Sequence, residues 1–131
     1  MSLNYTCNFS EINLYKKKSI KSEVVTQIIY GESFSIIKKS SKWLKIKILE
    51  DGYKGFIKNR NFSSYLKPTH KISVLKAKIY KNYKKKNKFS FLSFNSKIKT
   101  DLKKSNFYKF KNGWIERKSV KPIKFKRNDF F

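Results

Sequence analysis

Apolar and polar residues alternate in short runs along this chain, in the pattern expected of β-strands. The clearest run is 43–48, where Leu44, Ile46 and Ile48 share one face and lysines occupy the other. Further runs rich in β-branched and aromatic residues are 24–30, 34–37 and 55–57. Asp51-Gly52 separates runs 43–48 and 55–57 and is a hairpin-turn signal. Short strands at this close spacing predict an all-β fold of small barrels or sandwiches.

The second half of the chain repeats motifs of the first half at a slowly shortening offset. The shortening, together with the absence of an Asp-Gly turn before Gly113, indicates a shorter interior hairpin in the second copy. The matching triplets are Leu14-Tyr15-Lys16 with Ile79-Tyr80-Lys81, Trp43-Leu44-Lys45 with Phe107-Tyr108-Lys109, and Gly55-Phe56-Ile57 with Gly113-Trp114-Ile115.

Two barrels of similar size are therefore expected, joined by the linker Lys67-Pro68-Thr69, where proline ends the strand ladder. We predict an N-terminal segment at 1–8, a first domain at 9–67, a second domain at 68–125, and the start of a missing or truncated C-terminal segment at 126–131. Each barrel is small enough to be marginally stable alone, so we expect the two to pack together.

The charge of the chain is large, and its source limits what it implies. There are 33 basic and 8 acidic residues, a net charge of +25, yet only Arg60, Arg117 and Arg127 are arginines. Abundant Phe and Tyr with few Gly and Pro indicate an A/T-rich bacterial genome, whereas selection for phosphate recognition favours arginine. The clusters Lys16–Lys18 and Lys84–Lys86 are interpreted as solvated loops. We expect non-specific polyanion binding at low salt.

Composition excludes several classes of protein. Hydrophobic residues make up 39% and aromatic residues 17% of the chain, too rich for a disordered polypeptide. No run approaches the ~18 apolar residues of a membrane span, and no signal peptide is recognisable, so the chain as given is expected in the cytoplasm, or in the cell envelope if another route exports it. One cysteine, Cys7, and one histidine, His70, predict neither a disulfide nor a metal site, and no cofactor is implied.

The motifs of the first half resemble a bacterial SH3-like (SH3b) domain. They are Leu14-Tyr15, Ser22-Glu23-Val24-Val25-Thr26-Gln27, Tyr30-Gly31-Glu32, Trp43-Leu44-Lys45-Ile46 and Asp51-Gly52-Tyr53-Lys54-Gly55-Phe56-Ile57. More specifically, they are similar to the first of the tandem SH3-like domains that precede the catalytic domain of NlpC/p60-type cell-wall peptidases, with Phe56 in place of the usual Trp. Leu92-Ser93-Phe94-Asn95 and Gly113-Trp114-Ile115 resemble the second domain. The resemblance implies two tandem SH3-like β-barrels.

Enzymes of this group cleave γ-D-glutamyl–diamino acid bonds in murein peptides with a cysteine nucleophile in an Asp-Cys-Ser-Gly motif and a histidine base. That motif is absent here, and the chain ends about where the first catalytic helix would begin. The alternatives are a fragment, a truncated or split gene, or a catalytic partner elsewhere. We assign no catalytic residue, because Cys7 and His70 have no recognisable third group to orient them. Whether the chain belongs to an enzyme stays open.

Glu32 and Tyr53 are the candidate substrate-binding residues. The resemblance implies that the first SH3-like domain helps to recognise the free amino terminus of the substrate peptide, and a carboxylate with a phenol hydroxyl suits an ammonium group. The alternative is a turn glutamate paired with a neighbouring lysine and a core tyrosine in the hairpin. Four further rings, Trp43, Phe56, Tyr108 and Trp114, are candidates for lining a groove for peptide or glycan. We expect most of these rings to lie in the core, since small barrels need their area for burial.

The sequence therefore predicts a non-catalytic module that binds murein peptide or peptidoglycan and positions substrate for an NlpC/p60-type cysteine endopeptidase domain, in the same or a separate chain. The main alternative is an RNA- or polyanion-binding SH3-like barrel protein, and a third is a free-standing wall-binding protein. No nucleic-acid motif is visible, and the basic residues are spread along the whole chain.

Overall fold

A computed structural model describes residues 4–84 and 88–123 of the chain. The chain divides into two compact units, Met1–Leu66 and Lys67–Phe131. Within the described residues, regular structure consists of β-strands and a single 3-10 turn, η1 (Arg117–Ser119), so the predicted all-β fold is confirmed. No helix in these residues has the length and apolar character needed to cross a membrane. The predicted segment 126–131 lies outside the described residues, as do Lys85 and Lys86 of the second lysine cluster.

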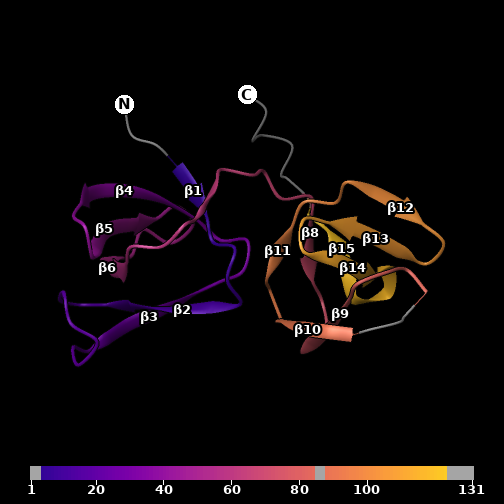
Figure 1. Cartoon of the computed structure of the whole chain (residues 1–131), viewed down its shortest axis with the longest axis horizontal. Helices are drawn as coiled ribbons and strands as arrows, with labels where there is room; N and C mark the ends of the chain where they lie inside the picture. Colours follow the sequence, from indigo (N-terminus) through magenta and orange to yellow (C-terminus); the bar gives the residue numbers. More distant parts are fainter. Residues whose placement is uncertain (1–3, 85–87, 124–131) are drawn as a thin grey trace. The chain divides into compact units, whose positions relative to one another are not determined.

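The first unit contains one seven-stranded sheet. Its strands are β1 (Asn4–Thr6), β2 (Glu11–Tyr15), β3 (Val24–Ile29), β4 (Ser33–Lys39), β5 (Trp43–Ile48), β6 (Lys54–Lys58) and β7 (Ser63–Ser64). Their order in the sheet is β3-β2-β6-β5-β4-β1-β7, and every pairing is antiparallel. Figure 1 shows the sheet folded on itself, with the β2–β3 hairpin opposite strands β4, β5 and β6. The alternating runs of the sequence correspond to β3, β4, β5 and β6.

The core of the first unit lies between these two layers. Strand β5 directs Leu44, Ile46 and Ile48 inward, each at most 1% exposed, as the alternation predicts. They pack with the other members of a buried cluster, which are Cys7, Leu14, Ile28, Phe34 and Ile57. Strand β1 lies between β4 and β7, so residues 4–6 of the predicted N-terminal segment form part of the sheet.

Two turns shape the end of the sheet at which β4 and β6 begin. Gly52 has a φ of +78°, a conformation in which a side chain is strained, and its N–H donates to the Ile48 carbonyl at 2.9 Å. The predicted Asp-Gly turn between β5 and β6 is therefore present. A second turn joins β3 to β4, where the Glu32 N–H donates to the Ile29 carbonyl at 3.1 Å.

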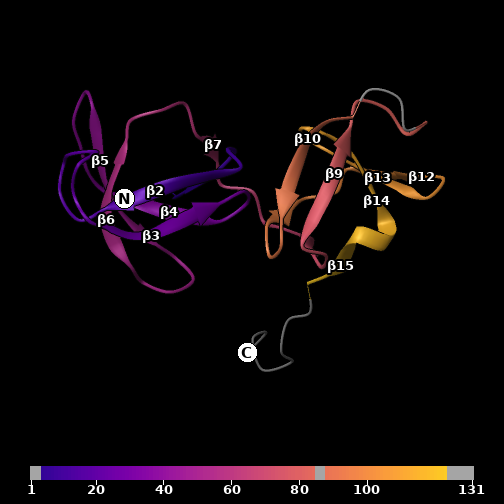
Figure 2. The same ribbon diagram turned by 90° about the horizontal axis from the view of Figure 1, so that it is seen from below.

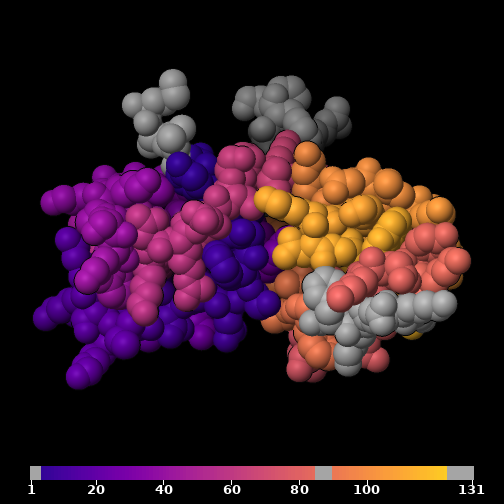
Figure 3. Space-filling view, in the orientation of Figure 1, coloured from indigo at the N-terminus to yellow at the C-terminus, as the bar shows by residue number. Residues whose placement is uncertain are grey.

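The second unit has a five-stranded and a three-stranded sheet. Its strands are β8 (His70–Ile72), β9 (Lys76–Tyr80), β10 (Lys88–Ser93), β11 (Lys97–Ile98), β12 (Leu102–Lys104), β13 (Phe107–Phe110), β14 (Gly113–Glu116) and β15 (Val120–Pro122). The orders are β10-β9-β14-β13-β12 and β11-β8-β15. Figure 2 shows β9 and β10 side by side. In Figure 3 the yellow residues of β14, η1 and β15 lie at the surface of this unit, beside orange β12 and β13.

Each unit contains a three-strand ladder, and the two ladders have corresponding registers. In the first, Phe56 of β6 pairs with Tyr15 of β2 on one side and with Lys45 of β5 on the other. In the second, Trp114 of β14 pairs with Tyr80 of β9 and with Lys109 of β13. These are the positions that the sequence repeat aligns. The β13–β14 hairpin is also shorter than the β5–β6 hairpin, as the shortening offset predicts.

Candidate functional site

Aromatic side chains gather on the outer face of the first sheet, where β2, β6 and β5 are neighbours. Trp43 and Phe56 alternate with core residues of β5 and β6, so period two directs them away from the core. The Tyr15 ring meets the Trp43 ring edge to face, with centroids 6.0 Å apart. All three rings are half-buried. Each keeps an accessible surface on which a ligand can stack.

Lysines border this aromatic surface. The Lys18 Nζ lies 5.8 Å and the Lys45 Nζ 6.0 Å from the centroid of the Phe56 ring. These distances are at the outer limit for a cation–π contact. Lys18 belongs to the exposed loop between β2 and β3, as predicted for the first lysine cluster. The face therefore combines ring area with positive charge.

The second unit has an aromatic surface at the corresponding place. The Trp114 ring lies 5.4 Å from the Tyr83 ring, with the Lys109 Nζ 5.9 Å from its centroid. Tyr108 lies elsewhere in this unit, 4.6 Å from the His70 ring, and the Arg117 guanidinium lies 5.6 Å from the Tyr108 centroid.

The expectation that most of the candidate rings lie in the core is wrong. Trp43, Phe56, Tyr108 and Trp114 are half-buried, and Tyr53 is 52% exposed. Aliphatic residues and other rings fill the cores instead. Alternation along β5, β6 and β14 leaves Trp43, Phe56 and Trp114 on the outer faces, whereas Tyr108 is only half-buried although its register partner Ile115 lies in the core.

Glu32 and Tyr53 lie at the same end of the β4–β5–β6 sheet. Glu32 precedes β4 and Tyr53 precedes β6, with the end of β5 between them, so about two strand spacings or ~10 Å separate their strands. The Ile29 N–H donates to the Glu32 Oε1 at 2.9 Å, and the Glu32 backbone carbonyl accepts from the Cys7 N–H at 2.8 Å. Glu32 thus stabilises its own turn, while Tyr53 presents its side chain to solvent.

Cys7 has the wrong environment for a nucleophile. It is fully buried, and this burial raises the pKa of the thiol to about 11, with a smaller contribution from the nearby Glu32 carboxylate. The Cys7 Sγ donates to the Phe9 carbonyl at 3.4 Å. A thiolate is the reactive species, and it is disfavoured here. Cys7 therefore has a structural role in the core of the first unit. His70 belongs to the second unit.

Residues 10–67 match the family model described as "Bacterial SH3 domain". The match covers less than half of the chain, and we use the name SH3 domain for this matched region, residues 10–67. This SH3 domain contains Glu32, Tyr53 and the aromatic surface of Tyr15, Trp43 and Phe56. A search of curated proteins found no match.

The fold of the SH3 domain and of the second unit is also similar to that of a solved protein. An NlpC/P60 family protein from Bacillus cereus ATCC 10987 superposes with a TM-score of 0.71 at 14% sequence identity. The similarity covers 92% of this chain and 56% of that chain, so this chain spans little more than half the length of that protein. At this identity the likeness shows a shared fold.

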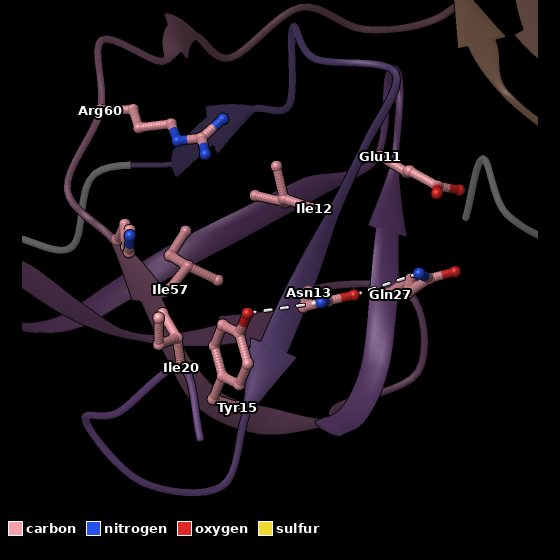
Figure 4. Close-up of a pocket in the computed structure, with 9 residues that line it drawn as sticks. Glu11, Ile12, Asn13, Tyr15, Ile20, Gln27, Ile57 and Arg60 are labelled. Atoms are coloured by element: carbon pink, nitrogen blue, oxygen red, sulfur yellow. Dashed lines mark hydrogen bonds between the residues drawn. The ribbon is translucent and has the colours of Figure 1, made fainter. Parts of the chain in front are cut away.

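Sequence reasoning missed a pocket of about 300 Å³ in the SH3 domain. Figure 4 shows it between β2, with Glu11, Asn13 and Tyr15, and the end of β6, followed by Arg60. Glu11, Asn13 and Arg60 belong to no motif of the sequence, and Arg60 is distant from the other two, so no local signal marks the pocket. No group of His, Cys, Asp or Glu suitable for a metal ion occurs in residues 4–84 and 88–123.

Proposed function

We propose that this chain is the non-catalytic part of an NlpC/p60-type cysteine endopeptidase, binding murein peptide and positioning it for a catalytic domain in the same or another chain. The observation that carries this proposal is the bacterial SH3 domain at 10–67, together with a fold shared with an NlpC/P60 family protein over 92% of the chain. In this proposal the second unit is also an SH3-like barrel. Its ladder register, which corresponds to that of the first unit, supports this.

The surfaces of the two units support binding to a wall polymer. Each unit carries half-buried rings bordered by lysines, namely Trp43 and Phe56 in the first and Tyr83 and Trp114 in the second. Aromatic faces stack on extended ligands, and lysines attract their carboxylates. Two such surfaces on one chain would let it engage two positions of a repetitive polymer, which raises the avidity.

Glu32 and Tyr53 are proposed to bind the ammonium group of the murein peptide. Glu32 supplies negative charge in a chain with few acids, and Tyr53 supplies an exposed phenol at the same end of the sheet. A charge-assisted hydrogen bond from an ammonium to a carboxylate is about twice as strong as a neutral one. The turn that Glu32 stabilises would hold its carboxylate in a defined place.

Retention on purified murein sacculi tests the proposal. The full chain is mixed with sacculi at about 0.15 M salt, where exposed charges more than ~8 Å apart are screened, and the bound fraction is measured after washing. We expect saturable retention, weakened about tenfold or more by Glu32→Gln and less by Tyr53→Phe, because the first loses a hydrogen bond to a charged group. Gln keeps an oxygen that accepts the Ile29 N–H, so the turn is preserved.

Matched variants control for general effects of charge and ring chemistry. Glu23→Gln removes an exposed carboxylate, and Tyr65→Phe removes the hydroxyl of a tyrosine that is 47% exposed. Both should leave retention unchanged. Absence of retention, or equal losses in the control variants, would contradict the proposal.

The polyanion alternative is separated by its dependence on salt. Binding to nucleic acid that rests on counterion release weakens steeply as salt rises. Sequence-selective RNA or DNA binding that persists at about 0.15 M salt, without retention on sacculi, would favour a nucleic-acid module. Murein binding also requires the chain to reach the cell envelope, and fractionation of cells that express it from its own locus tests that location.

A further inference from the structure

Strands β2 and β6 are neighbours in the SH3 sheet, yet they pair at one position, Tyr15 with Phe56. Because the strands are antiparallel, continued pairing would join Leu14 to Ile57 and then Asn13 to Lys58, and Glu11 would oppose Arg60. No such pairs form, and the strands separate from that point. The pocket of about 300 Å³ occupies the opening. We call this opening the β2–β6 seam.

Backbone groups of both strands point into the seam. Next to β6, the Ile48 N–H donates to the Tyr53 carbonyl, and the Asn59 N–H donates to the Lys42 carbonyl. The backbone groups of odd-numbered residues of β6 therefore bond to β5, and those of Lys58 are directed toward β2. On β2, the Tyr30 N–H donates to the Ser10 carbonyl, so even-numbered residues bond to β3 and Asn13 is directed toward β6. The seam thus has two open strand edges, whose backbone N–H and C=O groups are available to a ligand.

Side chains in the seam suit a peptide. Figure 4 shows Ile12 and Ile57 in the middle, with Asn13 and Gln27 along one side. The Asn13 Nδ2 donates to the Tyr15 hydroxyl at 3.4 Å, and the Gln27 Nε2 donates to the Asn13 Oδ1 at 3.1 Å. These bonds orient the amides. The seam therefore offers amide groups for a peptide backbone and an apolar floor for a small side chain.

Opposite charges flank the open end of the seam. Glu11 and Arg60 lie on opposite sides of it in Figure 4, and Tyr15 lies at the closed end. In the part of the chain that the structure describes, neither Glu11 nor Arg60 has an ion pair within 4 Å. The Arg60 guanidinium rests over the Phe9 ring, 5.0 Å from its centroid, which orients the group. A carboxylate and a guanidinium so placed match the two ends of a zwitterion.

We propose that the open end of the β2–β6 seam binds a free dipeptide or tripeptide with small side chains, which crosses the seam with its ammonium end on Glu11, its carboxylate end on Arg60, and its amide on the Asn13 side chain. A volume of about 300 Å³ is at the small end of the range for ligand pockets (~300–1,000 Å³), which limits the ligand to this size. Glu32 and Tyr53 do not line the seam, and the inference does not depend on the proposed function.

Calorimetric titration of the full chain with L-alanyl-L-alanine tests the proposal. We expect one saturable site on the chain. The N-acetylated and the C-amidated dipeptides should each bind about tenfold or more weakly, because each loses a hydrogen bond to a charged group. The dipeptide methylated on its amide nitrogen should also bind more weakly, because it loses the donor for the Asn13 side-chain oxygen. These probes leave the protein unchanged, so unfolding cannot cause the losses.

Variants then identify the site. Glu11→Gln and Arg60→Gln should each weaken binding of L-alanyl-L-alanine about tenfold or more. Glu50→Gln and Arg117→Gln, which change residues outside the seam, should not weaken it. Circular dichroism establishes that each variant is folded. No binding at millimolar peptide, equal effects of Arg60→Gln and Arg117→Gln, or indifference to blocking of the peptide ends would each overturn the proposal.

Discussion

Gly55 lies where β6 approaches β2 most closely, and substitution by alanine should destabilise the SH3 domain severely. A Cβ at this position would lie 2.7 Å from the Tyr15 carbonyl oxygen and 2.8 Å from the Leu14 Cγ. Leu14 is fully buried, and the Tyr15 backbone forms the single β2–β6 pair, so neither neighbour can move cheaply. Overpacking of this kind costs about 1–3 kcal/mol, and we expect the upper end, ~3 kcal/mol.

The expected loss is large against the stability of the domain. A unit of this size is stable by roughly 3–10 kcal/mol, at about 0.05–0.15 kcal/mol per residue. Urea unfolding measures the free energy of unfolding, with Trp43 fluorescence in a Trp114→Phe background reporting on the first unit alone. A loss of ~3 kcal/mol should also lower the Tm by more than about 10 °C.

Gly52→Ala is the matched control. Gly52 has a positive φ of +78°, but its Cβ would meet nothing closer than the Lys47 Cε at 3.9 Å. The cost should be that of the left-handed conformation alone, about 1–2 kcal/mol. If Gly55→Ala costs no more than Gly52→Ala, or if it costs under ~1 kcal/mol, the close approach of β2 and β6 does not control stability and the reasoning is refuted.

Three further predictions concern ionisable groups. The pKa of the Cys7 thiol is raised from 9.0 to about 11, so the free energy of unfolding should be unaffected by this group below pH 9 and should fall as the pH rises toward 11. Urea unfolding of Cys7→Ala should show a smaller fall over this pH range. The native thiol should also resist alkylation at pH 8. Burial lowers the pKa of His70 below 6.5, so the second unit should lose stability as pH falls below that value, and His70→Gln should remove the effect in unfolding followed by Trp114 fluorescence. Retention on an anionic resin should disappear near physiological salt, whereas retention that is independent of salt would refute a purely electrostatic origin.

The strands of the SH3 domain could be predicted from local sequence because their physical cause is local. A strand with one buried face needs apolar side chains at every second position, and residues 43–48 satisfy this, with Leu44 and Ile46 buried in β5. The repeat was also visible, because two similar ladders need similar side chains at corresponding places. It aligned Phe56 with Trp114, which occupy corresponding register positions.

Burial of the candidate rings could not be predicted from the same pattern. Alternation shows that Trp43 and Leu44 point to opposite faces, but both are apolar, and the pattern does not show which face becomes the core. The structure assigns that role to Leu44, because Leu14, Ile28 and Phe34 pack on the same side. Trp43 remains on the outer face, half-buried against Tyr15.

The sequence by itself determined the all-β class, the main strands, the Asp-Gly hairpin turn and the motifs of a bacterial SH3 domain. The tertiary structure decided that β1 joins the sheet between β4 and β7, that β2 and β6 separate after a single pair, and that Glu11 and Arg60 flank the resulting opening. Strand formation depends on residues a few positions apart. The choice of neighbours and the point where two strands part depend on how distant segments share one core, which no local pattern records.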